Sequence, residues 1–135
     1  MASVEQYLFS FLQSKTALTA LIGTKLYPQR APQKTNPPYI RYSLISESPN
    51  HSHDVQADLT RVMDFQFSIF ATSYQAAATI RDVLITALNG VHRTVTIGSP
   101  PTTATLAAQH TNSVAFYEED TEIHHIAVDF TVWCR

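Results

Sequence analysis

RVMDFQFSIFATSYQAAATIRDVLITALNG, residues 61–90, places a strand pattern directly before a helix pattern. Between Met63 and Ile69 every second residue is nonpolar, which predicts a strand with one packed face and one wet face. From Ser73 onward nonpolar residues recur at helical spacing, with Ser73 as the expected N-cap and Gly90 as the terminator. A strand and a helix that share one core indicate a mixed fold.

Two further helices are expected before this unit. Residues 3–14 carry nonpolar side chains at helical spacing, with Ser3 and Gln6 at the spacing of a capping box. A shorter helix follows, with Thr16 as its cap and Gly23 as its left-handed terminator. The side chains of this second helix that we expect to face inward are Ala17, Leu18, Leu21 and Ile22.

The remaining segments have the alternation or composition of strands. A short strand near residue 26 leads into a proline-rich loop, and the prolines exclude it from a central sheet position. Longer strands are expected at 39–48, 92–98, 103–120 and 121–135. The order ααβββαβββ predicts an α+β fold, a mainly antiparallel sheet with helices packed on one face, in a single domain over residues 1–135.

Composition restricts the function. Lys and Arg number 9 against 11 Asp and Glu, so the formal net charge of −2 argues against a surface that grips nucleic acid. Cys134 is the single cysteine and cannot form an internal disulfide. No signal peptide or long nonpolar run is evident, so we expect a protein made in a reducing cytoplasm, without a membrane segment.

Polar residues concentrate at 46–61, which we interpret as a loop between two long strands. His51, His53 and Asp54 lie close enough in sequence to bind a metal ion. A closed zinc site needs about four ligands with fixed partners, whereas this run has the composition of a solvated turn. A small metal-binding or enzymatic α+β domain that uses His51, His53 and His125 stays open as an alternative, and stoichiometric metal in the purified protein would favour it.

Other chemical motifs are weak. The sequence has no G-x-S-x-G elbow and no glycine-rich phosphate loop, so we expect no enzyme and no cofactor. His124 and His125 should point to opposite faces of their strand, with Asp129 on the face of His125. The acidic run at 118–122 is expected to be a solvated hairpin tip or a contact for a basic partner.

Four segments in this order resemble the phage tail completion proteins, a family of tail terminators and head-to-tail joining proteins of long-tailed bacteriophages. They are VEQYLFSFLQSKTALTALIGTKLYP (4–28), APQKTNPPYIRYSLIS (31–46), DFQFSIFATSYQAAATIRDVLITALNG (64–90) and EDTEIHHIAVDFTVWC (119–134). Each is chiefly a packing pattern, and their order and spacing carry the resemblance over nearly the whole chain.

The resemblance implies a structural protein of the virion tail, at its head-proximal end, with no catalytic residues to transfer and no membrane contact. Such proteins form a ring, commonly hexameric, that stops polymerisation of the tail tube and presents a surface to the head connector. The implied partners are other copies of the chain, the major tail tube protein and the head completion or connector protein. DNA would pass through the ring without specific binding, and another kind of virion assembly module remains an alternative.

Within such a ring the 46–61 loop gains a role, because we expect it to meet a neighbouring subunit or the tail tube. The acidic hairpin tip is the second expected contact. The residues assigned to partner contacts are Asn50, His51, His53, Asp54, Gln56, Asp58, Glu118, Glu119 and Asp120.

Overall fold

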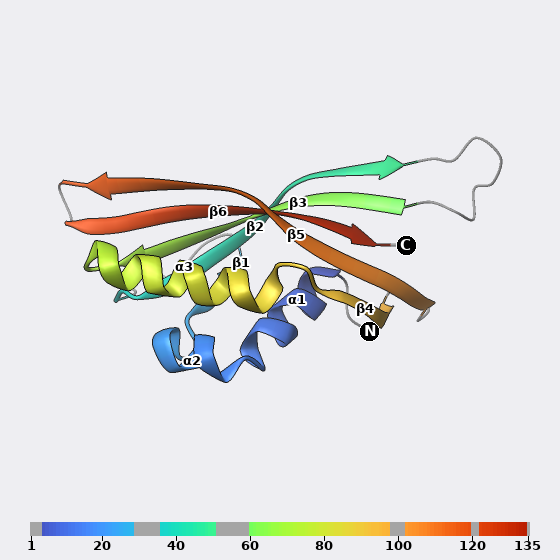
Figure 1. Ribbon diagram of the computed structural model, residues 1–135, viewed down its shortest axis with the longest axis horizontal. Coiled ribbons are helices and arrows are strands. Elements are labelled where there is room, and N and C mark those ends of the chain that lie inside the picture. Colours follow the sequence, from blue (N-terminus) through green and yellow to red (C-terminus); the bar gives the residue numbers. More distant parts are fainter. Residues whose placement is uncertain (1–3, 29–35, 51–59, 98–101, 120–121, 135) are drawn as a thin grey trace.

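Three helices pack against one face of a six-stranded sheet in this computed structural model, which describes residues 4–28, 36–50, 60–97, 102–119 and 122–134 (Figure 1). The helices are α1 (Val4–Gln13), α2 (Thr16–Ile22) and α3 (Tyr74–Leu88). The strands are β1 (Leu26–Pro28), β2 (Tyr39–Asn50), β3 (Thr60–Ala71), β4 (His92–Ile97), β5 (Thr102–Glu118) and β6 (Ile123–Cys134). The predicted α+β fold and the order ααβββαβββ are confirmed. Within the described ranges no helix is long and apolar enough to cross a membrane.

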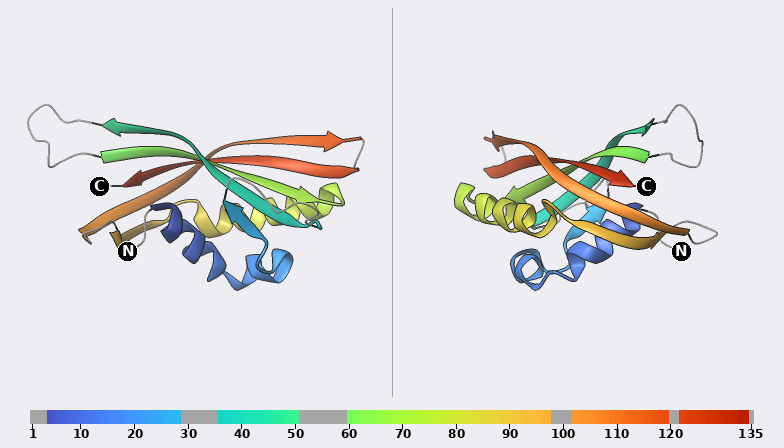
Figure 2. Two further views of the ribbon diagram at one scale, coloured as in Figure 1. Left: turned by 180° about the vertical axis from the view of Figure 1, so that it is seen from behind. Right: turned by 45° about the vertical axis from the view of Figure 1, so that its right-hand side comes forward.

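The strands are arranged in the order β1-β2-β3-β6-β5-β4. Only the β1–β2 pair is parallel, and the other pairs are antiparallel. The short strand β1 ends at Pro28 and lies at the edge of the sheet, as expected for a strand that contains proline. The β2–β3 and β5–β6 hairpins are long and point in opposite directions (Figures 1 and 2). Each therefore extends the sheet at a different end.

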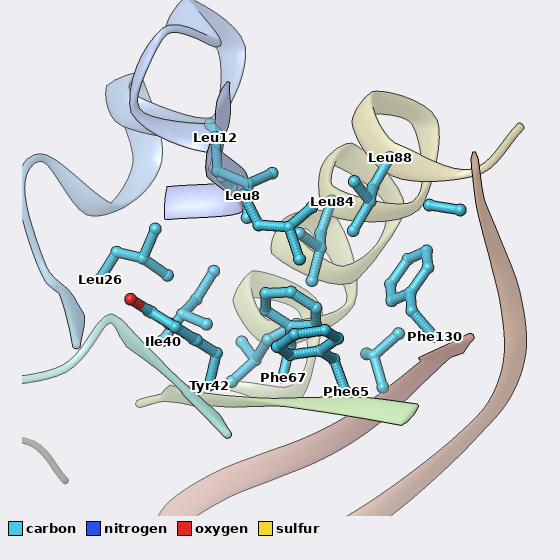
Figure 3. Close-up of a cluster of buried hydrophobic side chains, with 14 of the residues drawn as sticks. Leu8, Leu12, Leu26, Ile40, Tyr42, Phe65, Phe67, Leu84, Leu88 and Phe130 are labelled. Carbon is cyan, nitrogen blue, oxygen red and sulfur yellow. The ribbon is translucent and has the colours of Figure 1, made fainter. Parts of the chain in front are cut away.

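The core lies between the sheet and the helices (Figure 3). Alternate residues of β3 and β6 are buried on this side, as their sequence pattern predicts. Phe67 lies at the centre, with its ring centroid 5.6 Å from that of Phe130 and 6.0 Å from that of Tyr42. The helix residues that cover these rings are Val4, Leu8, Phe11 and Leu12 of α1, Leu18 and Ile22 of α2, and Ala77, Ile80, Leu84 and Leu88 of α3.

Helix ends agree with the sequence for α3 but not for α2. The Ser73 hydroxyl accepts a hydrogen bond from the Ala76 amide at 3.1 Å, which confirms the predicted cap of α3. Thr16 is already inside α2, and its expected capping role was wrong because Lys15 takes the cap position without a side-chain hydrogen bond. Ala17 and Leu21 are exposed rather than inward, since a two-turn helix presents only one row of side chains to the core. Ser3 lies outside the described residues.

The loop expected at 46–61 is shorter than the sequence suggests. β2 continues to Asn50 and β3 begins at Thr60, and these two residues are paired in register. The polar residues from Ser46 onward belong to the strand because backbone pairing, rather than side-chain burial, holds them there. The stretch left between the strands, 51–59, lies outside the described residues.

We expect Phe67→Ala to lower the free energy of unfolding by about 3–5 kcal/mol, since a fully buried ring is lost and its neighbours cannot close the space. Urea denaturation of the purified protein measures this change. Gln75→Ala, at an exposed position of α3, is the matched control and should stay within about 0.5 kcal/mol of the parent. Equal losses for the two variants would contradict the assigned core.

Burial, and then the nearby Glu5 carboxylate, raise the pKa of the Tyr42 hydroxyl above its usual range. The folded chain therefore keeps this phenol protonated at a pH where the unfolded chain ionises it. The associated stability is fully present below about pH 10 and is lost as pH rises through the folded pKa. Tyr42→Phe should abolish this component of the loss, measured by urea denaturation between neutral and alkaline pH. Tyr74→Phe, at an exposed site, should retain the loss.

Candidate assembly surface

Most residues predicted to contact partners lie outside the described ranges; these are His51, His53, Asp54, Gln56, Asp58 and Asp120. Asn50 ends β2 opposite Thr60, and Glu118 ends β5 opposite Ile123. Glu119 follows in an exposed turn. Asn50 and Glu118 thus mark the ends of two hairpins that point in opposite directions (Figure 1). Asn50 and Glu118 therefore lie at different ends of the sheet within one subunit.

The histidines near the end of β5–β6 pack against aromatic rings. His125 stacks on Phe70 with ring centroids 4.4 Å apart, and the Phe116 ring lies 5.3 Å away. His124 contacts Tyr117 at 4.7 Å from the other side of the sheet, which agrees with the predicted alternation. Among the described residues, no three His, Cys, Asp or Glu side chains gather into a group that could hold a metal ion.

The sheet face turned away from the helices, here called the open face, carries a row of rings across four strands. Tyr39, Phe70, His125 and Phe116 lie in register on β2, β3, β6 and β5. Tyr39 and Phe70 stack at 4.8 Å, and the Arg41 guanidinium lies 5.3 Å from the Phe70 ring centroid. Such contacts contribute about 0.5–1.5 kcal/mol per aromatic pair. Phe70 is buried by its neighbours in the row, whereas Phe116 at the end of the row stays 52% exposed.

Polar side chains occupy the middle of the open face. Asp64 accepts hydrogen bonds from the hydroxyls of Ser46 and Thr131, both at 2.9 Å. The Gln66 amide donates to the Asp129 carboxylate at 3.2 Å. With hydrogen-bond partners on neighbouring strands, these carboxylates need no cation to be stable at this surface.

Both outer edges of the sheet are only partly covered in the described part of the chain. β1 pairs with β2 at Ile40–Tyr42 alone, and β4 pairs with β5 at Thr102–Ala107. We call Ser43–Asn50 the β2 free edge and Asn112–Glu118 the β5 free edge, because no described strand adds to either. Unpaired edges of this length are sites at which another strand can bind.

Exposed nonpolar side chains concentrate at these edges. Val114, Phe116 and Tyr117 lie on the β5 free edge, and each is exposed. Ile45 lies at a β-bulge in the β2 free edge and is 60% exposed. Nonpolar side chains beside unpaired backbone groups are unfavourable in water, so both edges have the character of protein contact surfaces.

The sequence also marks the β5 free edge as a contact surface, by a run of nonpolar residues. Residues 114–117 read VAFY, four nonpolar residues in succession after the five polar residues 109–113. A strand with one wet face should not be nonpolar at both parities. Such a run predicts that both faces near the end of β5 are covered, although the described chain leaves them open.

Comparison with known proteins decides the family, since the family model of tail completion protein gp17 matches residues 6–135. The chain belongs to this family. Among solved structures, one chain of the virion of a native gene transfer agent particle is similar, with a TM-score of 0.67 and 20% sequence identity. The match covers 94% of this chain and 90% of that chain, so the two share a fold. No curated protein matches the sequence.

As a member of this family, the chain is a structural protein of the phage tail and belongs to the virion. The family is not a class of enzymes. The resemblance identified from the four sequence segments is therefore confirmed. Structural tail proteins act through contacts with other proteins, which directs attention to the two free edges and the hairpin ends.

Proposed function

We propose that this tail completion protein is a tail terminator, which forms a closed ring at the head-proximal end of the tail tube. The ring stops further polymerisation of the tube and joins the tail to the head connector. The observation that carries the proposal is the pair of partly covered edges on opposite sides of the sheet. A ring requires contacts between two unlike patches of the same subunit, and these edges are two such patches.

The shape of the subunit suits a joining role. The β2–β3 and β5–β6 hairpins reach out in opposite directions (Figure 2), so each subunit offers contacts at two ends. A protein that links a tube to a connector needs contacts of this kind. Under this proposal the partners are further copies of the chain, six in the simplest ring, together with the major tail tube protein and the head completion or connector protein.

The charge balance suits a channel for DNA. With a net charge of −2, a ring of these subunits would be mildly acidic and would not hold phosphates, which bind to clustered Lys and Arg. DNA would then pass without specific binding. The acidic hairpin residues Glu118, Glu119 and Asp120 are proposed to contact a protein partner rather than nucleic acid.

The ring is tested by light scattering and negative-stain microscopy of the purified protein, and by locating the chain in assembled tails. We expect particles of one defined copy number, and labelled protein at the head-proximal end of each tube. A protein that is monomeric in solution and absent from tube ends would overturn the terminator role.

We also propose that residues 51–59, which join β2 to β3, contact a neighbouring subunit or the tube. Because Asn50 and Thr60 are paired, replacing 51–59 by a two-residue Asn-Gly turn should preserve both strands. We expect a variant with normal thermal unfolding that no longer limits tail length, measured by microscopy of tails. A control loop of nine Gly and Ser residues separates the effect of loop length from that of His51, His53, Asp54, Gln56 and Asp58. Normal tails with the Asn-Gly turn would exclude a role for the segment.

A further inference from the structure

We propose that the β5 free edge of one subunit pairs, antiparallel, with the β2 free edge of the next copy, so that one sheet continues across the subunit boundary. This inference deepens the ring proposed above by naming its subunit interface.

Each β3 residue and the residues paired beside it on the neighbouring strands form one row across the sheet. Counted in these rows, the two free edges have the same length. The β2 free edge covers the rows from Thr60, opposite Asn50, to Gln66, opposite Ser43. The β5 free edge begins in that same Gln66 row, at Asn112 opposite Asp129, and ends one row beyond Ala71, at Glu118. Each edge therefore spans seven rows, one at each end of the sheet.

β1 and β4, which cover other parts of the same two strands, limit how the free edges can meet. β1 covers Ile40–Tyr42, which precede the β2 free edge in the chain. β4 covers Thr102–Ala107, which precede the β5 free edge. Full pairing of both edges requires the neighbour to be displaced by six rows along the strands. At this displacement β1 and β4 lie just beyond the two ends of the joined segment, so the two steps fit together.

The same displacement matches the faces of the two strands. Ser46 lies in the row of Asp64 and Phe116 in the row of Phe70, six residues further along β3, so these two residues become directly opposite. An even displacement keeps open-face side chains beside open-face side chains. Leu44 then lies opposite Tyr117 on the helix side, and the exposed Ile45 lies beside Phe116. The nonpolar side chains of both edges would cover one another.

The stagger also agrees with the geometry of closed sheets. Each subunit contributes four strands to the continuous sheet, β2, β3, β6 and β5. A displacement of six residues is about 20 Å along the strands, against about 19 Å across four strands. The strands would then tilt by roughly 45° to the ring axis, at the upper end of the range typical of β-barrels.

Charge favours this pairing over other arrangements of two copies. The turn after β5 carries the exposed Glu119 and Glu122, and the pairing brings it toward the end of the neighbouring sheet that holds Lys25 and Arg41. A twofold pairing of β5 with β5 would leave the β2 edge and its exposed Ile45 uncovered. The pairing of unlike edges covers both with a single kind of contact, which can close into a ring.

The interface is tested by mixing two proteins that each carry one introduced cysteine, Ser46→Cys and Phe116→Cys, under mild oxidation. Directly opposite residues of an antiparallel pair have Cα atoms about 4.5–5.5 Å apart, within the range for a disulfide. We expect a disulfide-linked dimer as the main product of the mixture, and no such dimer from either protein alone. The native Cys134 is buried and should not react. The mixing is done with purified protein and, in parallel, by co-expression during tail assembly.

The matched control is Ser46→Cys mixed with Ala115→Cys, because Ala115 is exposed on the same edge but points to the other face. Equal cross-linking of Ala115→Cys would overturn the register. A dimer formed by Phe116→Cys alone would indicate twofold β5 pairing and overturn the proposal. Absence of the mixed dimer in both samples would also overturn it.

A second variant tests the backbone contact itself. Ala108 bonds through its N–H and C=O to residues beside β4. The β-bulge between His110 and Asn112 shifts the alternation by one residue, so the Ala115 N–H also points outward. Ala115→Pro should therefore leave the circular dichroism and thermal unfolding of the subunit unchanged and abolish the ring. A ring that persists with Ala115→Pro removes this interface but leaves the terminator role standing. Rings that are cross-linked at this interface but never bind a tube end would support the interface and overturn the terminator role.

Discussion

The pairing of β3 with β6 is the constraint on which the rest of the structure depends. These strands are in continuous register from Arg61 opposite Cys134 to Ala71 opposite His124. The pairing places Phe65, Phe67 and Phe130 together under the helices, and so fixes which parity of every other strand is buried. β2 and β5 add to the outer sides of this pair, and their free ends become the exposed parts of the subunit.

The open face explains how a sheet with helices on one side alone can be stable. Its aromatic row buries Phe70 without a second layer, since Tyr39, His125 and Arg41 cover the ring. Beside that row, hydroxyl and amide groups satisfy the carboxylates of Asp64 and Asp129. Among the described residues, the centre of this face therefore carries no large exposed nonpolar patch. Unpaired backbone groups and exposed nonpolar side chains are concentrated at the two free edges of the sheet.

The sequence predicts elements whose side chains alternate between core and solvent. β3, β6 and α3 follow from such patterns, because burial of one face selects their residues. The length of β2 does not, since its residues beyond Ser46 are polar and are held by backbone pairing with β3. The sequence predicts partner contacts at the polar 46–61 loop and at the acidic hairpin tip, and it does not predict the free edges of β2 and β5. Those edges depend on strand order, which pairs β6 with both β3 and β5 and is not encoded in any local pattern.

Exposed strand edges normally carry a risk of uncontrolled aggregation, and the shape of this subunit limits that risk. β1 and β4 each block part of one edge, so a second copy cannot slide along the sheet. An approaching strand gains the full length of either edge only when it ends where β1 or β4 begins. The β2 and β5 edges of this chain meet that condition for each other, so the features that discourage non-specific pairing also select the copy of the same protein, in one register and one direction.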